Sequence, residues 1–325
     1  MTIHVLKRET FTSQDVCIPI QDMELDTSNA SYSGALKIRL EGNIEAPLIA
    51  VLGGISAGRN VSGPEGWWRQ IVGKGQAIDL NQYCVLAIDF LPGDDEASKH
   101  AFITTGDQAR ALTYALKHLD RTQFHAIIGS SYGGMVALQF AARYPDLVGR
   151  IAVYGASHHA SQMSVARRSL QRKIIRLASR LGDASAGLAL ARELAMTTYR
   201  SHEEFEARFT APEPGKNGEI AAGVNDYLAA RGGAFQTVMT AERFMTLSRS
   251  IDLHTVNPED VSIPAYLLAC RQDQIVPVSD MRKLQARLQG TAILTEFDSI
   301  YGHDAFLKET GIVSAFLQSA LNGGE

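Results

Sequence analysis

Short apolar runs alternate with amphipathic stretches along the first half of the chain. The apolar runs cover residues 47–52, 83–90, 124–128 and 150–154. Short, continuous apolar runs bounded by turn residues are typical of strands that are buried on both faces of a parallel sheet. Helical patterns lie between them at 107–119 and 134–144, and two more strands are predicted at 265–269 and 292–297. The pattern therefore predicts an α/β fold with a mostly parallel sheet covered by helices.

This alternation stops between Tyr154 and Pro264. Helices are predicted there at 164–180, 184–198 and 241–252, and a loop at 211–219, with few strand patterns among them. We interpret residues 1–155 and 260–325 as the α/β core, and residues 156–259 as a helical lid inserted between two late strands. The alternative is a separate second domain.

Composition and charge indicate which kinds of binding partner and which cellular compartment to expect. The 325 residues carry a formal net charge of −4, so there is no overall positive field to attract nucleic acid. The N-terminus is polar with mixed charge, unlike a signal peptide, and no apolar run approaches the length of a membrane span. Cys17, Cys84 and Cys270 are scattered without CxxC spacing, which predicts neither a disulfide framework nor a metal site. We expect a cytoplasmic protein without nucleic-acid or membrane partners, in which Cys84 and Cys270 are buried.

The sharpest local motif is Gly129-Ser130-Ser131-Tyr132-Gly133. It fits the pattern G-x-S-x-G and lies between a predicted strand and a predicted helix, as the nucleophile elbow of an α/β-hydrolase fold requires. The glycines allow a tight turn that exposes the Ser131 hydroxyl above the sheet. Ser130 is the nearest competitor, but it lacks a glycine two residues before it. We therefore predict an α/β-hydrolase fold with Ser131 as the nucleophile.

A serine hydroxyl needs a base, and in this fold the base follows the acid in the chain. His303 lies after the last predicted strand and before a C-terminal helix, where the fold places its base. His254 precedes the last two strands, and His158 and His159 precede any candidate acid. We predict His303 as the base and the other three as polar surface or rim residues.

The acid is expected at the end of a late strand, where it would orient the imidazole and stabilise its charged form. Asp273 follows the predicted strand at 265–269 directly. Asp298 is the second choice, and Asp280 is expected in the next helix. For the oxyanion hole, the two backbone donors are predicted to be Tyr132 and Ile55, with Gly54 as the alternative to Ile55.

Four further segments make the chain resemble the homoserine O-acyltransferase family. They are SYGGMVAL at 131–138, GLALARELAMTTYRS at 187–201, GHDAFL at 302–307 and GWWRQIVGKGQAID at 66–79. The resemblance implies a ping-pong transfer, in methionine biosynthesis, of an acyl group from acyl-CoA to L-homoserine. It implies that Arg192 and Asp304 contact the acceptor amino acid, and that the protein is a homodimer. Acyl-CoA would be a co-substrate, with no bound cofactor and no metal.

The acyl group and the acceptor are less sharply defined by these residues. The loop GGISA at 53–57 and the short chain differ from common family patterns. Some succinyl-transferring members carry a basic residue two positions after the catalytic aspartate, where this chain has Ile275, but not all succinyl enzymes carry it. Short members with such loops look closer to succinyl-transferring relatives, so succinyl is favoured over acetyl. The alternatives are the same chemistry on L-serine, or a serine hydrolase of the same fold.

One helix in the lid region is strongly basic. Its basic residues are Arg167, Arg168, Arg172, Lys173, Arg176 and Arg180. We interpret the run as the exposed face of an amphipathic helix, with a site for CoA phosphates as the alternative.

Overall fold

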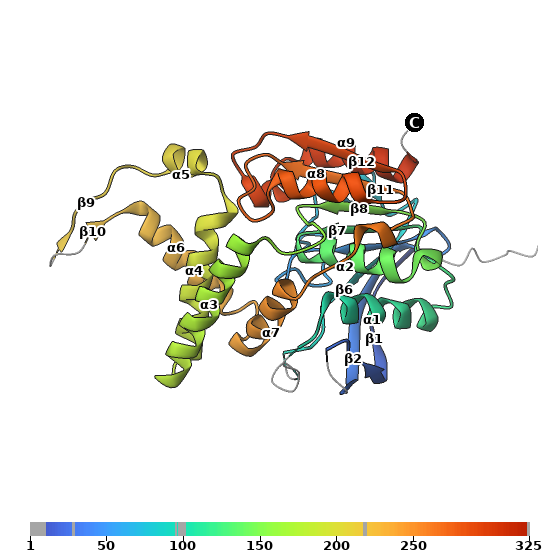
Figure 1. Cartoon of the computed structure of the whole chain (residues 1–325), viewed down its shortest axis with the longest axis horizontal. Coiled ribbons are helices and arrows are strands. Elements are labelled where there is room, and N and C mark those ends of the chain that lie inside the picture. The colour runs from blue at the N-terminus through green and yellow to red at the C-terminus, as the bar shows by residue number, and fades with distance from the viewer. Residues whose placement is uncertain (1–10, 28–29, 95, 97–101, 217–219, 324–325) are drawn as a thin grey trace, which may run out of the picture.

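An eight-stranded sheet forms the centre of the computed structural model, which describes residues 11–27, 30–94, 96, 102–216 and 220–323 (Figure 1). The strand order is β1-β2-β6-β3-β7-β8-β11-β12. The strands are β1 (Phe11–Glu24), β2 (Ser31–Asn43), β3 (Leu48–Leu52), β6 (Cys84–Ile88), β7 (Ala126–Ser130), β8 (Ile151–Tyr154), β11 (Ala265–Cys270) and β12 (Ala292–Phe297). Neighbours from β6 to β12 run parallel, whereas β1 and β2 are antiparallel. All six predicted strands and the predicted α/β class are therefore confirmed.

The strand β3 illustrates why the apolar runs are continuous. Leu48, Ala50 and Leu52 belong to one hydrophobic cluster, and Ile49 and Val51 belong to another. Because successive side chains of a strand point to opposite faces, a strand covered on both faces is apolar at every position. Both faces of the sheet are thus buried at β3.

Helices cover the sheet on these two faces (Figure 1). Those of the core are α1 (Thr105–His118), α2 (Tyr132–Arg143), α8 (Val278–Arg287) and α9 (Thr310–Asn322). Buried side chains of α1, α2 and α8 pack in the first cluster, and those of α9 pack in the second. The start of α1 is fixed by a capping box between Thr104 and Asp107, which satisfies two backbone donors at the helix end.

A block of helices separates β8 from β11 along the chain and lies to one side of the sheet (Figure 1). It consists of α3 (Gln162–Arg180), α4 (Ala184–Tyr199), α5 (His202–Arg208), α6 (Gly223–Phe235) and α7 (Ala241–Asp252). The three helices predicted here are confirmed, and α5 and α6 are additional. Inside the predicted loop 211–219, Glu213–Pro214 form the short strand β9, so the prediction is wrong for these two residues. The strand β9 pairs with β10 (Ile220–Ala221), beyond the end of that loop, and residues 217–219 lie outside the described residues. We call α3–α7 the lid block.

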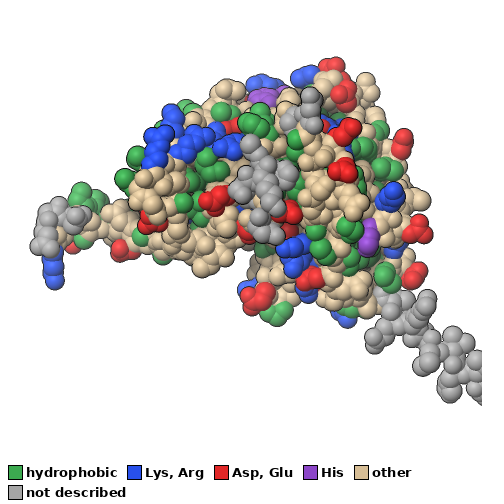
Figure 2. Space-filling view, turned by 90° about the horizontal axis from the view of Figure 1, so that it is seen from below, with side chains coloured by type: hydrophobic (Ala, Val, Ile, Leu, Met, Phe, Trp, Pro, Cys, Tyr) green, Lys and Arg blue, Asp and Glu red, His purple; other side chains and the backbone are tan. Residues whose placement is uncertain are grey.

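The lid block has its own small core and an unusual surface. This core contains the buried side chains of Ile175, Leu188, Phe235 and Phe244, which come from four helices of the lid block. On its outside, α3 exposes apolar side chains, and Figure 2 shows hydrophobic and basic side chains close together over this side of the molecule.

The structure also bears on the cysteines, on membrane-spanning helices and on clusters of metal-binding side chains. Cys84 and Cys270 are buried, as predicted, and Cys17 is exposed. Within the described ranges, no helix is long and apolar enough to cross a membrane. In the same part of the chain, no group of three or more His, Cys, Asp or Glu side chains could hold a metal ion.

Candidate active site

The turn between β7 and α2 places Ser131 in a strained backbone conformation. Its φ is 52° and its ψ is −118°, a region that costs a non-glycine residue of order 1–3 kcal/mol. A Cβ atom on Gly129 would lie 2.3 Å from the carbonyl oxygen of Gly133, and one on Gly133 would lie 2.3 Å from that of Leu52. Both glycines are therefore required by close backbone contacts. The Ser131 N–H donates to Tyr154 O at 2.9 Å, which ties the turn to the neighbouring strand.

The structure brings Ser131, His303 and Asp273 into one hydrogen-bonded chain. His303 Nε2 lies 2.8 Å from Ser131 Oγ, and His303 Nδ1 lies 2.7 Å from Asp273 Oδ2. The other carboxylate oxygen, Oδ1, accepts from the backbone N–H of Ile275 at 2.7 Å and of Val276 at 3.0 Å. The carboxylate is thus fixed by the loop after β11. With a proton on Nδ1, His303 presents a free lone pair on Nε2 to the serine hydroxyl.

The other candidates for the acid and the base lie outside this chain of hydrogen bonds. Asp298 pairs with Arg271 at 2.5 Å, and Asp280 pairs with Lys283 at 3.1 Å. His254 is buried, and its ring contacts Thr105 Oγ1 at 2.8 Å and Ser157 O at 3.0 Å. The prediction that His254 is a surface or rim residue is therefore wrong.

Ser130 also lies apart from this chain of hydrogen bonds. Its side chain is buried, and its hydroxyl has no hydrogen-bond partner among the described residues. A residue at the last position of β7 points into the sheet packing, whereas Ser131 faces the cavity.

Two opposing effects set the protonation of His303. Burial lowers its pKa, but the charge and hydrogen bond of Asp273 outweigh burial, with a smaller contribution from Asp304, and the pKa is raised above its ordinary value. The positive charge of Arg168 acts in the opposite direction. An imidazole with a raised pKa is a stronger base, which suits proton transfer from a hydroxyl.

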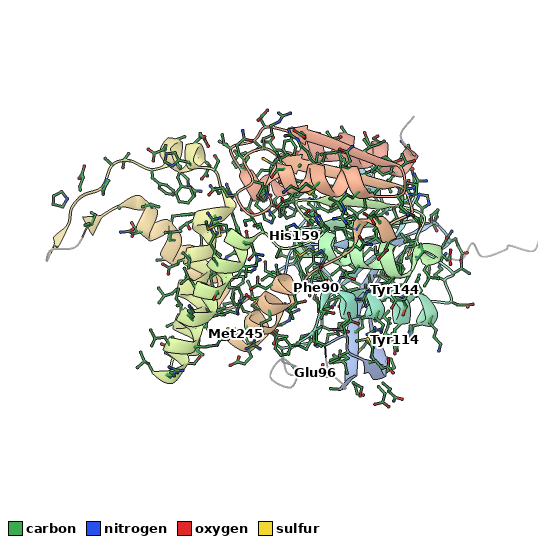
Figure 3. All side chains as sticks on the ribbon, in the orientation of Figure 1. Phe90, Glu96, Tyr114, Tyr144, His159 and Met245 are labelled. Carbon is green, nitrogen blue, oxygen red and sulfur yellow. The ribbon has the colours of Figure 1, made fainter. Side chains whose placement is uncertain are left out.

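Two backbone N–H groups near Ser131 are available for an oxyanion. Neither Tyr132 N–H nor Ile55 N–H has a hydrogen-bond partner within the described ranges, and both residues line the same cavity as Ser131. Tyr132 begins α2, so its N–H also lies at the positive end of the helix dipole. Phe90, labelled in Figure 3, packs edge-on against the Tyr132 ring with 4.7 Å between centroids.

The loop that carries Ile55 is held by Trp67. The indole N–H of Trp67 donates to Gly58 O at 3.0 Å, and a Cβ on Gly53 would come within 2.9 Å of the indole ring. Trp68 donates to Phe306 O at 2.9 Å and so anchors the segment that carries His303. The two tryptophans of the GWW motif thus hold the loop of Ile55 and the segment of His303, both of which line the cavity.

Gly155 is a second residue whose importance the sequence did not reveal. It has a φ of +54°, and a Cβ there would lie 3.2 Å from Cε1 of His303 and 3.4 Å from Oδ2 of Asp273. A glycine after β8 thus leaves space for the imidazole and the carboxylate. Its only sequence signal is a glycine directly after a strand.

A cavity of about 250 Å³ opens above Ser131 between the core and the lid block. The polar and charged side chains in its wall include those of Arg168, Gln171, Arg192, Arg231, His303 and Asp304. Arg192 stacks over Tyr199 and Phe235, with its guanidinium carbon 5.0 Å and 4.7 Å from the ring centroids. Within the described ranges these two rings are the interactions that Arg192 makes, without a hydrogen bond or ion pair, so its donors are available to an anion in the cavity.

Asp304 lines the cavity beside His303 but already has one partner. Its Oδ2 accepts from Nε of Arg200 at 3.0 Å, and Arg200 also contacts Glu204 at 3.3 Å. Its Oδ1 has no hydrogen bond within the described ranges. Arg200 is the arginine of the sequence TYRS, and it orients Asp304 through this ion pair.

The basic helix α3 departs from the sequence-based interpretation. Arg168 and Arg172 are only 11% and 12% exposed and both pair with Asp252 of α7, so the view of the whole run as an exposed face is wrong. Lys173, Arg176 and Arg180 are exposed. Asp252 is distant in the sequence, so α3 gives no sign of this partner.

Comparisons with known proteins place this geometry in a family. Residues 47–310 match the alpha/beta hydrolase fold family. The homoserine O-succinyltransferase of Xanthomonas campestris pv. campestris is 38% identical over 291 residues, which cover 88% of this chain and 78% of that protein. The chain belongs to the homoserine O-acyltransferase family.

A second relative agrees with this assignment, and solved structures agree with the fold. The homoserine O-acetyltransferase of Thermus thermophilus is 33% identical over 80% of this chain and 73% of its own length. The crystal structure of homoserine O-acetyltransferase from Bacillus anthracis has a TM-score of 0.86, with 20% identity over 95% of this chain and 98% of that chain. Esterase E22 has a TM-score of 0.87 at 16% identity, over 95% of this chain and 100% of that chain. The homoserine O-acyltransferase family thus shares its fold with esterases, and only the contents of the cavity can separate the activities.

Proposed function

We propose that this protein transfers an acyl group from acyl-CoA to the side-chain hydroxyl of L-homoserine. Ser131 Oγ attacks the thioester carbonyl while His303 takes its proton, and that proton then leaves with the CoA thiolate. The homoserine hydroxyl next attacks the Ser131 ester, again giving its proton to His303, which returns it to Ser131. The N–H groups of Tyr132 and Ile55 stabilise the oxyanion in both steps. Acyl-CoA acts as a co-substrate, with no bound cofactor.

The observation that carries the proposal is the pair of opposite charges beside Ser131. An amino acid in zwitterionic form needs a cation for its carboxylate and an anion for its ammonium group. Arg192 offers a guanidinium without an acidic partner within the described ranges, and Asp304 offers its free Oδ1, in the cavity that Ser131 lines. An esterase for neutral substrates has no need of this pair.

The acyl group that we propose is succinyl. The relative at 38% identity is named a homoserine O-succinyltransferase, whereas the relative at 33% is named an acetyltransferase. We further propose that the reaction serves methionine biosynthesis in the cytoplasm.

The proposed function can be tested by following thiol release from succinyl-CoA and acetyl-CoA with purified protein. We expect release to depend on L-homoserine and to yield O-acyl-homoserine, identified by mass spectrometry. L-serine is the matched acceptor, one methylene shorter. Release without an acceptor, giving free acid, would identify a hydrolase instead, and a higher rate with L-serine would identify a serine acyltransferase.

Arg192→Ala is expected to raise the KM for L-homoserine. Loss of one charged hydrogen bond of about 1.5–3 kcal/mol corresponds to a change of about 10- to 150-fold in KM. The measurement is a homoserine titration at saturating acyl-CoA. Arg176→Ala, an exposed arginine on α3 that does not line the cavity, is the control and should leave this KM unchanged. An unchanged KM in Arg192→Ala would remove Arg192 from the acceptor site.

We also propose that the protein is a homodimer that pairs through α3. Met163, Leu170 and Leu177 recur every seven residues and are 62%, 52% and 62% exposed. A stripe of this spacing lies along one face of a helix and suits packing against a second helix.

The double substitution Leu170→Glu with Leu177→Glu is therefore expected to convert a dimer into a monomer, because it buries two carboxylates at the interface. Light scattering after size-exclusion chromatography measures the mass. Ile293→Glu, on the other side of the molecule in β12, introduces a charge at a comparably exposed position and should leave the mass unchanged. A monomeric wild-type protein would contradict the proposal.

A further inference from the structure

Beneath the cavity, α3 and α7 are joined by a charge cluster with an excess of one positive charge. Arg168 Nε lies 2.5 Å from Asp252 Oδ1, and Arg172 Nη2 lies 2.6 Å from Asp252 Oδ2. Arg172 Nη1 also lies 2.7 Å from Ser248 Oγ. Two guanidinium groups thus share one carboxylate. All three charged side chains are only 11–12% exposed, so water screens the remaining charge weakly.

The two arginines differ in what they face. Arg172 is held by Asp252 and Ser248 and does not line the cavity, whereas Arg168 does. Within the described ranges, only Nε of Arg168 makes a hydrogen bond; its Nη2 is buried without a partner. Leaving a buried donor unpaired is unfavourable, and for a charged group more so. Nη2 is enclosed by the protein, so a ligand in the cavity can approach the guanidinium only at Nη1, which makes no hydrogen bond within the described ranges.

The roles of Arg192 and Asp304 indicate which part of the substrate would supply a hydrogen-bond acceptor for Arg168. In the proposed function, Arg192 and Asp304 take the two charges of L-homoserine. Arg168 and Ser131 line the same cavity, so an acyl group attached to Ser131 extends into the space that Arg168 borders. Gln171, three residues further along α3, lines the same wall. An acetyl group has no acceptor at its methyl end, whereas a succinyl group ends in a carboxylate two methylenes beyond the ester carbonyl.

We infer that Arg168 selects acyl-CoA donors whose acyl chain ends in a carboxylate, by binding that carboxylate when the acyl group is on Ser131. The inference rests on the proposed function and specifies its donor. Arg172 Nη2 remains 2.6 Å from Asp252 Oδ2, so a substitution of Arg168 leaves the carboxylate with a counter-charge, although Oδ2 makes no hydrogen bond among the described residues.

The experiment compares acyl transfer to the enzyme from three donors, with thiol release and intact-protein mass as readouts. The donors are succinyl-CoA, acetyl-CoA and the neutral amide analogue succinamyl-CoA, which has nearly the shape of succinyl-CoA without its charge. For the wild-type protein, we expect kcat/KM for succinyl-CoA to exceed that for succinamyl-CoA by about 10- to 150-fold, the value of one charged hydrogen bond. Equal values would overturn the inference without the use of any variant.

Substitutions then assign the effect to Arg168. Arg168→Gln should abolish the difference between succinyl-CoA and succinamyl-CoA and leave acetyl-CoA within a few-fold of the wild type. Arg168→Lys, which retains the charge, should keep part of the difference. Arg172→Gln is the matched control from the same cluster, and we expect it to change all donors alike.

Other results have distinct meanings. An equal loss for all donors in Arg168→Gln would mean a structural role, and a change confined to the homoserine KM would mean an acceptor-binding role; both overturn the inference. If the wild-type protein forms no acyl-enzyme from any of the CoA esters, the proposed function itself fails. If it transfers acetyl and succinyl equally well to homoserine, the function stands and the assignment of Arg168 fails.

Discussion

Ser131→Ala is expected to abolish the acyl-enzyme and to lower kcat by roughly 10⁶-fold, the size of effect seen when a serine hydrolase loses its nucleophile. In the proposed mechanism the hydroxyl oxygen carries the acyl group, and among the described residues only Ser131 Oγ is hydrogen-bonded to His303 Nε2, at 2.8 Å. The measurement is the intact mass after incubation with acyl-CoA, combined with the rate of thiol release. The fold should persist, because the elbow is held by backbone contacts of Gly129 and Gly133 rather than by the serine side chain.

Ser130→Ala provides the matched control one residue away. Its hydroxyl is buried and unpaired within the described part of the chain, so its removal should leave activity unchanged and stability equal or slightly higher. An acyl adduct that persists in Ser131→Ala but disappears in Ser130→Ala would mean that the nucleophile is Ser130.

The strands of the fold were predictable from the sequence where burial on both faces leaves a continuous apolar run. The five central strands β3, β6, β7, β8 and β11 are short apolar runs, because both of their faces are covered. The edge strand β12 was also predicted, although it is only partly buried. The hairpin of β1 and β2 was missed because β1 is exposed along most of its length, and because its register shifts between Ile20 and Met23. Neither β1 nor β2 therefore has the continuous apolar run of a strand that is covered on both faces.

The site was predictable where spacing and chain order fix the chemistry, and less so where partners are distant. Ser131, Asp273 and His303 follow from the elbow and from the order of the late strands. The ion-pair partners of Asp304 and Arg168 could not be predicted from the sequence, because they are distant along the chain. Arg200 is 104 residues from Asp304, and Asp252 is 84 residues from Arg168. A buried ion pair between helices depends on which faces meet, and the sequence of α3 alone resembles an exposed basic helix.

Asp273→Asn is expected to lower kcat by about 10⁴-fold, because the imidazole would take the wrong tautomer. The backbone N–H groups of Ile275 and Val276 both donate to Oδ1, so an asparagine would keep its oxygen there. Its amide nitrogen would then replace Oδ2 and donate to Nδ1 of His303. The ring proton would move to Nε2, which faces Ser131 Oγ, and no lone pair would remain to accept the serine proton. Thiol release under saturating donor measures the loss, and Asp298→Asn, at an exposed carboxylate that pairs with Arg271, is the control.

The same substitution should also move the pH dependence of acylation. His303 acts as a base only when neutral, so the rate falls as the pH drops below its pKa, which Asp273 raises above 6.5. Without the charge of Asp273, burial and the positive charge of Arg168 both lower this pKa, and the acidic limb of the profile should shift to lower pH. A wild-type limb below pH 6.5, or a limb that stays in place in Asp273→Asn, would show that Asp273 does not control the charge of His303. A loss of activity with no shift would then point to orientation of the ring as the sole contribution of Asp273.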